Sequence, residues 1–213
     1  MGAPLFTVLD VEKTYRVGTT PGSGWFSAGQ PRLLKALNGV RLEIAEGDSI
    51  ALVGESGSGK STLVRLMLGL EPATDGRLLY RQVDIGQFDR AARQTFRREV
   101  AFIYQDARGS MNPRMRIRAI LAEPLRLYRL CPEPEIERRV LSLLEKVGLS
   151  ADLADRYPSE LSGGQVRRVA VARALAAEPK TIVADESVAG LDVSVQAQLL
   201  NLLRDLCREM GLS

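Results

Sequence analysis

The sequence lacks histidine altogether and contains only two cysteines, Cys131 and Cys207, among 213 residues. Two cysteines so far apart provide neither a disulfide framework nor the spacing of a metal site, so we expect reduced cytosolic thiols. No run of 18 or more apolar residues occurs, and the N-terminal residues do not have the pattern of a signal peptide. The sequence therefore predicts no membrane-spanning segment, and it shows no internal repeat or low-complexity stretch.

Strong charge of either sign is also missing. The formal net charge is +3, acidic and basic residues are interspersed, and no basic run stands out. A balance this mild does not indicate a nucleic-acid partner. With 45% hydrophobic residues, the chain can bury a sizeable core. Its length suits one globular α/β domain, or one domain that carries an inserted subdomain.

A glycine-rich stretch from residue 54 to residue 62 organises the rest of the chain. It fits G-x-x-x-x-G-K-[ST], the phosphate-binding loop, because it reads Gly54, Glu55, Ser56, Gly57, Ser58, Gly59, Lys60, Ser61 and Thr62. The apolar run 49–53 before it predicts a short buried strand. Leu63, Leu66, Met67 and Leu70 after it recur at helical spacing, and strand, loop and helix together are the context that the motif requires.

The residue types of this loop match the chemistry of phosphate binding. Glycines let backbone N–H groups surround an anion, and a helix N-terminus adds partial positive charge. Lys60 is expected to reach the terminal phosphates, and the Ser61 hydroxyl to bind Mg²⁺. The alternative is a plain Gly/Ser turn before an ordinary helix, which the strand and helix signals on either side disfavour.

Periodicity places the other elements. Loose alternation over 5–11 predicts a first strand and alternation over 33–44 its hairpin partner, so the first third is expected to be antiparallel β structure around the loop. An amphipathic face of Ile136, Val140, Leu143, Leu144 and Val147 predicts a helix that Gly148 ends. Further strands are expected at 77–80, 100–104 and 181–184, and further helices at 88–99, 117–149, from 165 to 177 and at 194–210.

Four weaker signals follow the loop in a fixed order: Gln105 at a strand end, the run Leu161-Ser162-Gly163-Gly164-Gln165, the pair Asp185-Glu186 after an apolar strand, and Asp192. Taken singly, a Gly-Gly pair is usually a turn and two carboxylates at a strand end are often a solvated cap. Together, and over essentially the whole chain, they resemble the ATPase subunit of an ATP-binding-cassette (ABC) transporter. The LSGGQ match to the signature of that family is complete and specific.

The resemblance implies a P-loop fold of the α/β class, with an antiparallel β subdomain (about 1–85), a helical subdomain (about 106–165) and a C-terminus that is incomplete. It implies that Asp185 binds Mg²⁺ and that Glu186 polarises the attacking water. Gln105 is expected to sense the γ-phosphate and the metal. The signature residues Ser162, Gly163, Gly164 and Gln165 are expected to contact ATP bound to the opposite subunit of a head-to-tail dimer, and Asp192 to couple the two sites.

Tyr15 resembles the aromatic residue that stacks on adenine in this family, although a strand-end core tyrosine is the alternative. Residues 105–114 resemble the Q-D-x-x-x-S-x-N-P-R run of the peptide and nickel importer ATPases, of the dipeptide F or nickel E type. That implies ATP and Mg²⁺ as cofactors, a membrane permease and a second ATPase subunit as partners, and a solute-binding protein as an indirect partner. We expect a location on the cytoplasmic face of the membrane.

The family carries a switch histidine on a strand shortly after the helix that is expected to end near Met210, and this sequence stops at Ser213. One interpretation is a fragment of a longer ATPase. Another is a degenerate subunit that binds ATP but hydrolyses it weakly. A soluble ABC ATPase without a permease, acting in translation or repair, is the remaining alternative, but the double cassettes or long insertions of such proteins are not seen.

Overall fold

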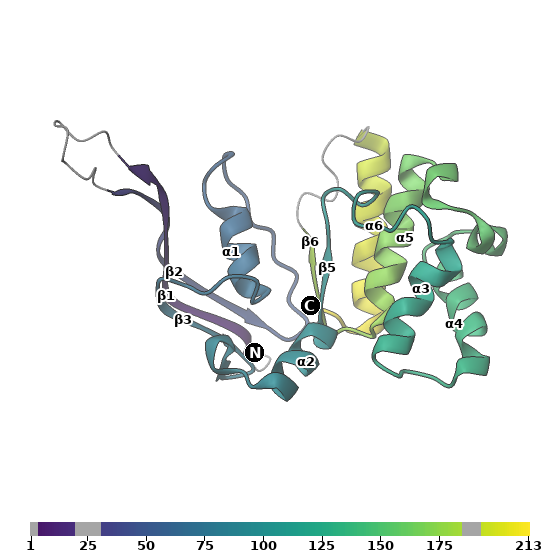
Figure 1. Ribbon diagram of the computed structural model, residues 1–213, viewed down its shortest axis with the longest axis horizontal. Coiled ribbons are helices and arrows are strands. Elements are labelled where there is room, and N and C mark those ends of the chain that lie inside the picture. Colours follow the sequence, from purple (N-terminus) through teal and green to yellow (C-terminus); the bar gives the residue numbers. More distant parts are fainter. Residues whose placement is uncertain (1–3, 20–30, 185–192) are drawn as a thin grey trace. The chain divides into compact units, whose positions relative to one another are not determined.

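The computed structural model describes residues 4–19, 31–184 and 193–213 (Figure 1). The chain divides into two compact units, Met1–Arg93 and Gln94–Ser213, and each is described by itself. Among the described helices, none has both the length and the apolar character needed to cross a membrane.

The first unit is built on an antiparallel sheet. Its strands are β1 (Pro4–Thr19), β2 (Pro31–Ala45), β3 (Asp75–Tyr80) and β4 (Val83–Asp84), in the order β2-β1-β3-β4. The predicted antiparallel start of the chain is therefore confirmed. Alternate residues of β1, such as Phe6 and Val8, are fully buried, and the Phe6 and Tyr80 rings pack with their centroids 5.0 Å apart.

Helix α1 (Lys60–Met67) follows the glycine-rich loop as predicted, and it buries Leu63, Leu66 and Met67. The prediction is wrong for Leu70, because α1 ends at Met67 and Leu70 lies beyond it, where its side chain is 61% exposed. Gly69 has a φ of 63° and its N–H donates to the Leu66 carbonyl, which ends the helix in the left-handed conformation before Leu70 is reached. After the turn η1 (Ile85–Gln87), helix α2 (Arg90–Glu99) confirms the helix expected at 88–99.

The buried strand expected at residues 49–53 is not found. This run has no strand hydrogen bonds to the described residues, and Val53 is 92% exposed. Apolar composition gives a segment a preference for burial, but the backbone hydrogen bonds of a strand must come from a neighbouring strand. The prediction considered composition alone and left that requirement out.

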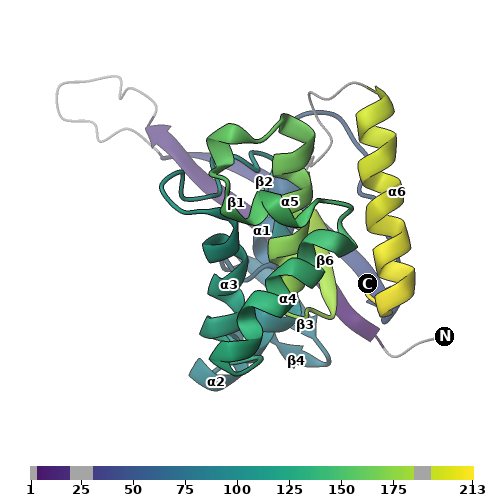
Figure 2. The same ribbon diagram turned by 90° about the vertical axis from the view of Figure 1, so that its right-hand side faces the viewer.

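The second unit combines a parallel strand pair with helices. Strands β5 (Val100–Ile103) and β6 (Thr181–Ala184) pair in parallel, with Val100 opposite Thr181. The helices are α3 (Ile117–Leu127), α4 (Glu133–Lys146), α5 (Gly163–Ala176) and α6 (Val193–Met210), with short turns η2 (Ala151–Asp155) and η3 (Pro158–Glu160) between α4 and α5. Helix α5 lies between α6 and the α3–α4 pair in both views (Figures 1 and 2).

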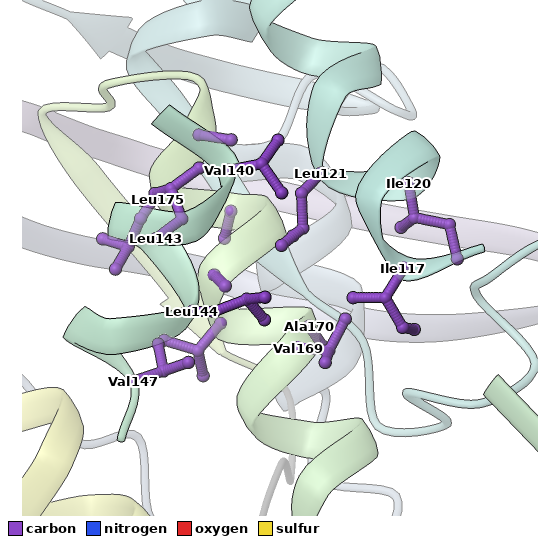
Figure 3. Packing of buried hydrophobic residues seen from close by; sticks show 14 of the residues in the cluster. Ile117, Ile120, Leu121, Val140, Leu143, Leu144, Val147, Val169, Ala170 and Leu175 are labelled. Atoms are coloured by element: carbon purple, nitrogen blue, oxygen red, sulfur yellow. The ribbon is translucent and has the colours of Figure 1, made fainter. Parts of the chain in front are cut away.

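One hydrophobic core holds these helices together, with α5 at its centre (Figure 3). Leu121 of α3, Leu144 of α4 and Val169 of α5 are each completely buried. Burial of such a side chain contributes about 1.5–3 kcal/mol. The predicted face of α4 is confirmed, since Ile136, Val140, Leu143, Leu144 and Val147 are all buried.

The end of α4 also follows the prediction. Gly148 has a φ of 67°, and its N–H donates to Glu145 while that of Leu149 donates to Leu144, the hydrogen bonds of a Schellman motif. Arg168 of α5 donates to the Val147 carbonyl at 2.7 Å, so a cation from the neighbouring helix satisfies a last carbonyl of α4.

Candidate nucleotide site

The glycine-rich loop adopts a backbone that two of its glycines make possible. Gly57 and Gly59 have φ values of 83° and 96°, which side-chain-bearing residues rarely adopt. Space is open around Gly57. At Gly59, a β-carbon would lie 2.6 Å from the Ala36 carbonyl oxygen of β2, so the absent side chain lets the loop rest directly on that strand.

The Lys60 side chain is hydrogen-bonded to the first two residues of this loop. Its ammonium donates to the carbonyls of Gly54 and Glu55 at 2.7 and 2.8 Å, and the Ser58 N–H donates to the Glu55 carbonyl at 3.2 Å. The ammonium is thereby fixed beside an exposed loop. Both of its described hydrogen bonds go to carbonyl oxygens and neither goes to a carboxylate, so its positive charge is not neutralised by these contacts.

The first turn of α1 adds hydrogen-bond donors to the same place. The N–H groups of Lys60, Ser61 and Thr62 have no acceptor within the helix, because the helix begins at Lys60. The Leu63 N–H is the first that donates to a preceding carbonyl, that of Gly59. Free N–H groups, the partial charge of the helix end and the Lys60 ammonium together suit a phosphate group. Ser61 is exposed in this turn, where a hydroxyl can serve as an oxygen ligand of Mg²⁺.

Tyr15 belongs to the same unit and is held by its hydroxyl. The hydroxyl donates to Glu71 Oε2 at 2.7 Å, and the Lys13 ammonium lies 5.1 Å from the centre of the ring. Lys13 is 9% exposed, binds the Pro72 carbonyl and pairs with Glu71 at 3.3 Å. The hydrogen bond from Tyr15, followed by the nearby Lys13 and Arg65 cations, lowers the pKa of Glu71, against an opposing effect of burial. Stacking of this fixed, partly buried ring on a base stays a prediction.

Gln105 lies in the second unit, two residues beyond the end of β5, and it is exposed. A tight turn follows, in which Asp106 Oδ1 accepts the Gly109 N–H at 2.8 Å and the Ser110 N–H donates to the Asp106 carbonyl at 3.1 Å. A β-carbon on Gly109 would collide with the Asp106 carboxylate. The turn therefore fixes the backbone on the C-terminal side of Gln105.

The LSGGQ run forms the start of α5. Ser162 is the N-cap: its Oγ accepts the Gln165 N–H at 3.3 Å, and the Gln165 Oε1 accepts the Ser162 N–H at 2.9 Å. This capping box uses the side chains of both ends of the motif within the chain. Gly163 differs, because a β-carbon there would meet nothing within 4 Å. Packing against the residues that the structure describes does not require this glycine, and its predicted contact with a nucleotide stays a prediction.

The remaining predicted site residues, Asp185, Glu186 and Asp192, lie outside the described residues. Strand β6 ends at Ala184, directly before Asp185. The loop 54–62 and Tyr15 both belong to the first unit, and Gln105 and the LSGGQ run both belong to the second.

Sequence reasoning missed several residues that support these motifs. The capping box had a readable signal, since Ser162 and Gln165 fit S-x-x-Q before an apolar run. Lys13 and Glu71, which hold Tyr15, are far apart in sequence and had none. Arg108 and Arg173, whose hydrogen bonds join the turn after Gln105 to the second unit's helices, were also missed.

Known proteins share both the sequence and this architecture. Residues 37–189 match the model of the ABC transporter family. The oligopeptide transport ATP-binding protein OppF of Escherichia coli (strain K12) is 47% identical over 210 residues, 98% of this chain and 62% of OppF. The nickel import ATP-binding protein NikE of Brucella abortus (strain 2308) is 45% identical over 177 residues, 83% of this chain and 66% of NikE. The chain spans 58% to 62% of the length of the OppF and DppF proteins of the enteric bacteria.

A solved structure of similar fold is the dimeric, post-hydrolysis state of the ATP-binding cassette MJ0796 bound to ADP and Pi. It superposes with a TM-score of 0.80 at 30% identity, covering 97% of this chain and 84% of that one. These matches confirm the expected α/β P-loop fold and the resemblance to the peptide and nickel importer ATPases. The chain therefore belongs to the ABC transporter family.

Proposed function

We propose that this chain is the ATP-hydrolysing, energy-coupling part of an importer for peptides, nickel or a related small solute. The observation that carries the proposal is the loop 54–60, in which the Lys60 ammonium is held between two carbonyls beside the free N–H groups of α1. The names of OppF and NikE, which cover peptides and nickel, leave both solutes open.

Binding of ATP would draw on three parts of the described structure. The phosphates would exchange the two carbonyl contacts of Lys60 for charge-assisted hydrogen bonds and take up the free N–H groups of the first turn. The Tyr15 ring would stack on the adenine. Ser61 and Asp185, with Gln105, would hold Mg²⁺. The bound Mg²⁺ would neutralise part of the negative charge of the phosphates.

Hydrolysis requires a water molecule in line with the terminal phosphate. Glu186 would orient and polarise that water, because a carboxylate next to a metal-binding one is well placed for this task. Gln105 would contact the γ-phosphate, and the open surface at Gly163 suits close approach of the γ-phosphate bound to a second subunit. The dimeric MJ0796 cassette supports pairing of two such subunits, which we propose to be head-to-tail. Asp192 would couple the two sites.

ATP turnover by the full-length natural protein tests the activity. Lys60→Ala should weaken ATP binding by about 10- to 150-fold, since a charged hydrogen bond is worth about 1.5–3 kcal/mol. Glu186→Gln should leave ATP binding unchanged and abolish turnover. Unchanged ATP affinity in Lys60→Ala would contradict the assignment of the loop, and normal turnover in Glu186→Gln would contradict the role of that carboxylate.

The transport role implies a permease, a second ATPase subunit, an indirect contact with a solute-binding protein and a location on the cytoplasmic face of the membrane. Purification of the tagged full-length protein from solubilised membranes tests these partners. Recovery of a permease is expected. Recovery of ribosomes or DNA without a permease would instead favour a soluble ABC ATPase.

A further inference from the structure

The turn after Gln105 is anchored in the core of the second unit. Within it, Ala107 and Met111 are buried, with exposed fractions of 5% and 4%. Between these anchors, the Ser110 hydroxyl donates to the Ala107 carbonyl at 2.8 Å and the Met111 N–H donates to the Arg108 carbonyl at 3.1 Å. The turn is therefore a small rigid body rather than a free loop.

Arg108 reaches from this turn to the start of α5. Its guanidinium donates through Nη1 to the Pro158 carbonyl and through Nη2 to the Leu161 carbonyl, both at 2.8 Å. Leu161 directly precedes the N-cap Ser162 and is buried. The two acceptors flank the turn that leads into the LSGGQ run, so one planar side chain fixes its position.

Arg173 makes the opposite connection. It lies on α5, and its Nη1 donates to the Ser110 carbonyl at 2.6 Å while its Nη2 donates to Ser110 Oγ at 2.9 Å. Burial lowers the pKa of this guanidinium, and the nearby Tyr104 and Glu123 oppose that effect. An arginine stays cationic at neutral pH in either case.

The two contacts are reciprocal and bidentate. Arg108 belongs to the turn and binds the start of α5, whereas Arg173 belongs to α5 and binds the turn. Each uses two nitrogens of a rigid fork, which fixes orientation as well as distance in a way that a lysine cannot. Neither pair of acceptors is a carboxylate, so the hydrogen bonds of these arginines hold backbone and hydroxyl oxygens in place.

We propose that Arg108 and Arg173 are positioning residues that lock the turn after Gln105 to the start of α5, so that Gln105 and the LSGGQ run move as one body during the ATP cycle. This inference rests on the proposed function, because it assigns a mechanical link between two groups that are proposed to contact nucleotide. Neither arginine needs to touch ATP itself.

The test compares Arg108→Ala and Arg108→Lys with the unaltered full-length protein. Arg108 is exposed, so its truncation opens no core cavity. In Arg108→Ala we expect the Gln165 and Val166 amides to exchange hydrogen about five- to thirtyfold faster, the factor for about 1–2 kcal/mol, because solvent weakens the two hydrogen bonds of this exposed guanidinium. ATP turnover should fall about ten- to hundredfold while the dissociation constant for ATP stays within about twofold. Arg108→Lys can keep one of the two hydrogen bonds, so its exchange rates and its turnover should lie between those of Arg108→Ala and of the unaltered protein.

Arg138→Ala is the matched control. This arginine of α4 has a side chain that is 77% exposed and pairs only with Glu135 on the same helix in the described structure, so exchange, affinity and turnover should not change. Arg173→Lys examines the reverse contact and should accelerate exchange of the Ser110 and Met111 amides.

Wild-type exchange rates at Gln165 and Val166 in Arg108→Ala would overturn the proposed link. Faster exchange with unchanged turnover would also overturn it, since the contact would then be structural only. A loss of ATP affinity in Arg108→Ala that matches its loss of turnover would also overturn the proposed link. Failure of the unaltered protein to hydrolyse ATP is a different result, because it refutes the proposed function and, with it, any role of the link in catalysis.

Discussion

Replacing Gly59 by alanine should destabilise the first unit far more than the same change at Gly57. Both glycines have a positive φ, and forcing an alanine into that conformation costs about 1–2 kcal/mol at either site. Only at Gly59 does the new β-carbon meet backbone, 2.6 Å from the Ala36 carbonyl oxygen. Ala36 lies in β2, which is paired to β1, so the strand cannot retreat without loss of sheet hydrogen bonds. Overpacking of this kind adds about 1–3 kcal/mol.

We therefore expect a loss of about 2–5 kcal/mol for Gly59→Ala and about 1–2 kcal/mol for Gly57→Ala. Urea unfolding followed by circular dichroism measures the totals. Hydrogen exchange at the Leu63 amide, which donates to the Gly59 carbonyl at 2.9 Å, reports the local effect on α1. Equal losses in the two variants would show that the contact with Ala36 carries no energy, and the packing explanation would be refuted.

Three further predictions concern single groups. Gly163→Ala should change stability by less than about 0.5 kcal/mol, because its β-carbon meets nothing, yet lower ATP turnover; full turnover would argue against close approach of a ligand there. Thr181→Val should stabilise the chain by about 1 kcal/mol in urea unfolding, since the buried Thr181 hydroxyl has no hydrogen-bond partner among the described residues; destabilisation would indicate that it has one. The lowered pKa of Glu71 adds stability above the ordinary glutamate pKa, and this stability is lost as pH falls through the lowered value. Tyr15→Phe removes the largest cause, so its destabilisation should be greater near pH 7 than near pH 3, and equal losses at both would rule out the linkage.

Local signals in the sequence were sufficient for much of the fold. The face of α4 and its end at Gly148 depend on contacts between residues three to five positions apart, and such contacts leave a periodic pattern. The loop 54–62 could also be predicted from the sequence, because its contacts are local: Lys60 binds carbonyls five and six residues earlier.

Interactions between distant segments could not be predicted in this way. The run 49–53 has the composition of a buried strand, but pairing is a property of two segments and cannot be read from one. Arg108 binds carbonyls 50 and 53 residues away, and nothing in the spacing of those residues marks them as partners. The failure at Leu70 has a different, local cause, since the apolar spacing continues past Gly69, the glycine that ends α1.

The capping box at the start of α5 would affect the speed of the proposed ATP cycle. Ser162 and Gln165 satisfy each other's hydrogen bonds within the chain, so the first turn of this helix is folded without help from a ligand. Ordering a flexible turn at each encounter would cost about 1–2 kcal/mol for every residue fixed. A molecule that docks at Gly163, as we propose, would meet a surface that is already folded, and its rate of docking would be set by diffusion and orientation rather than by a folding step.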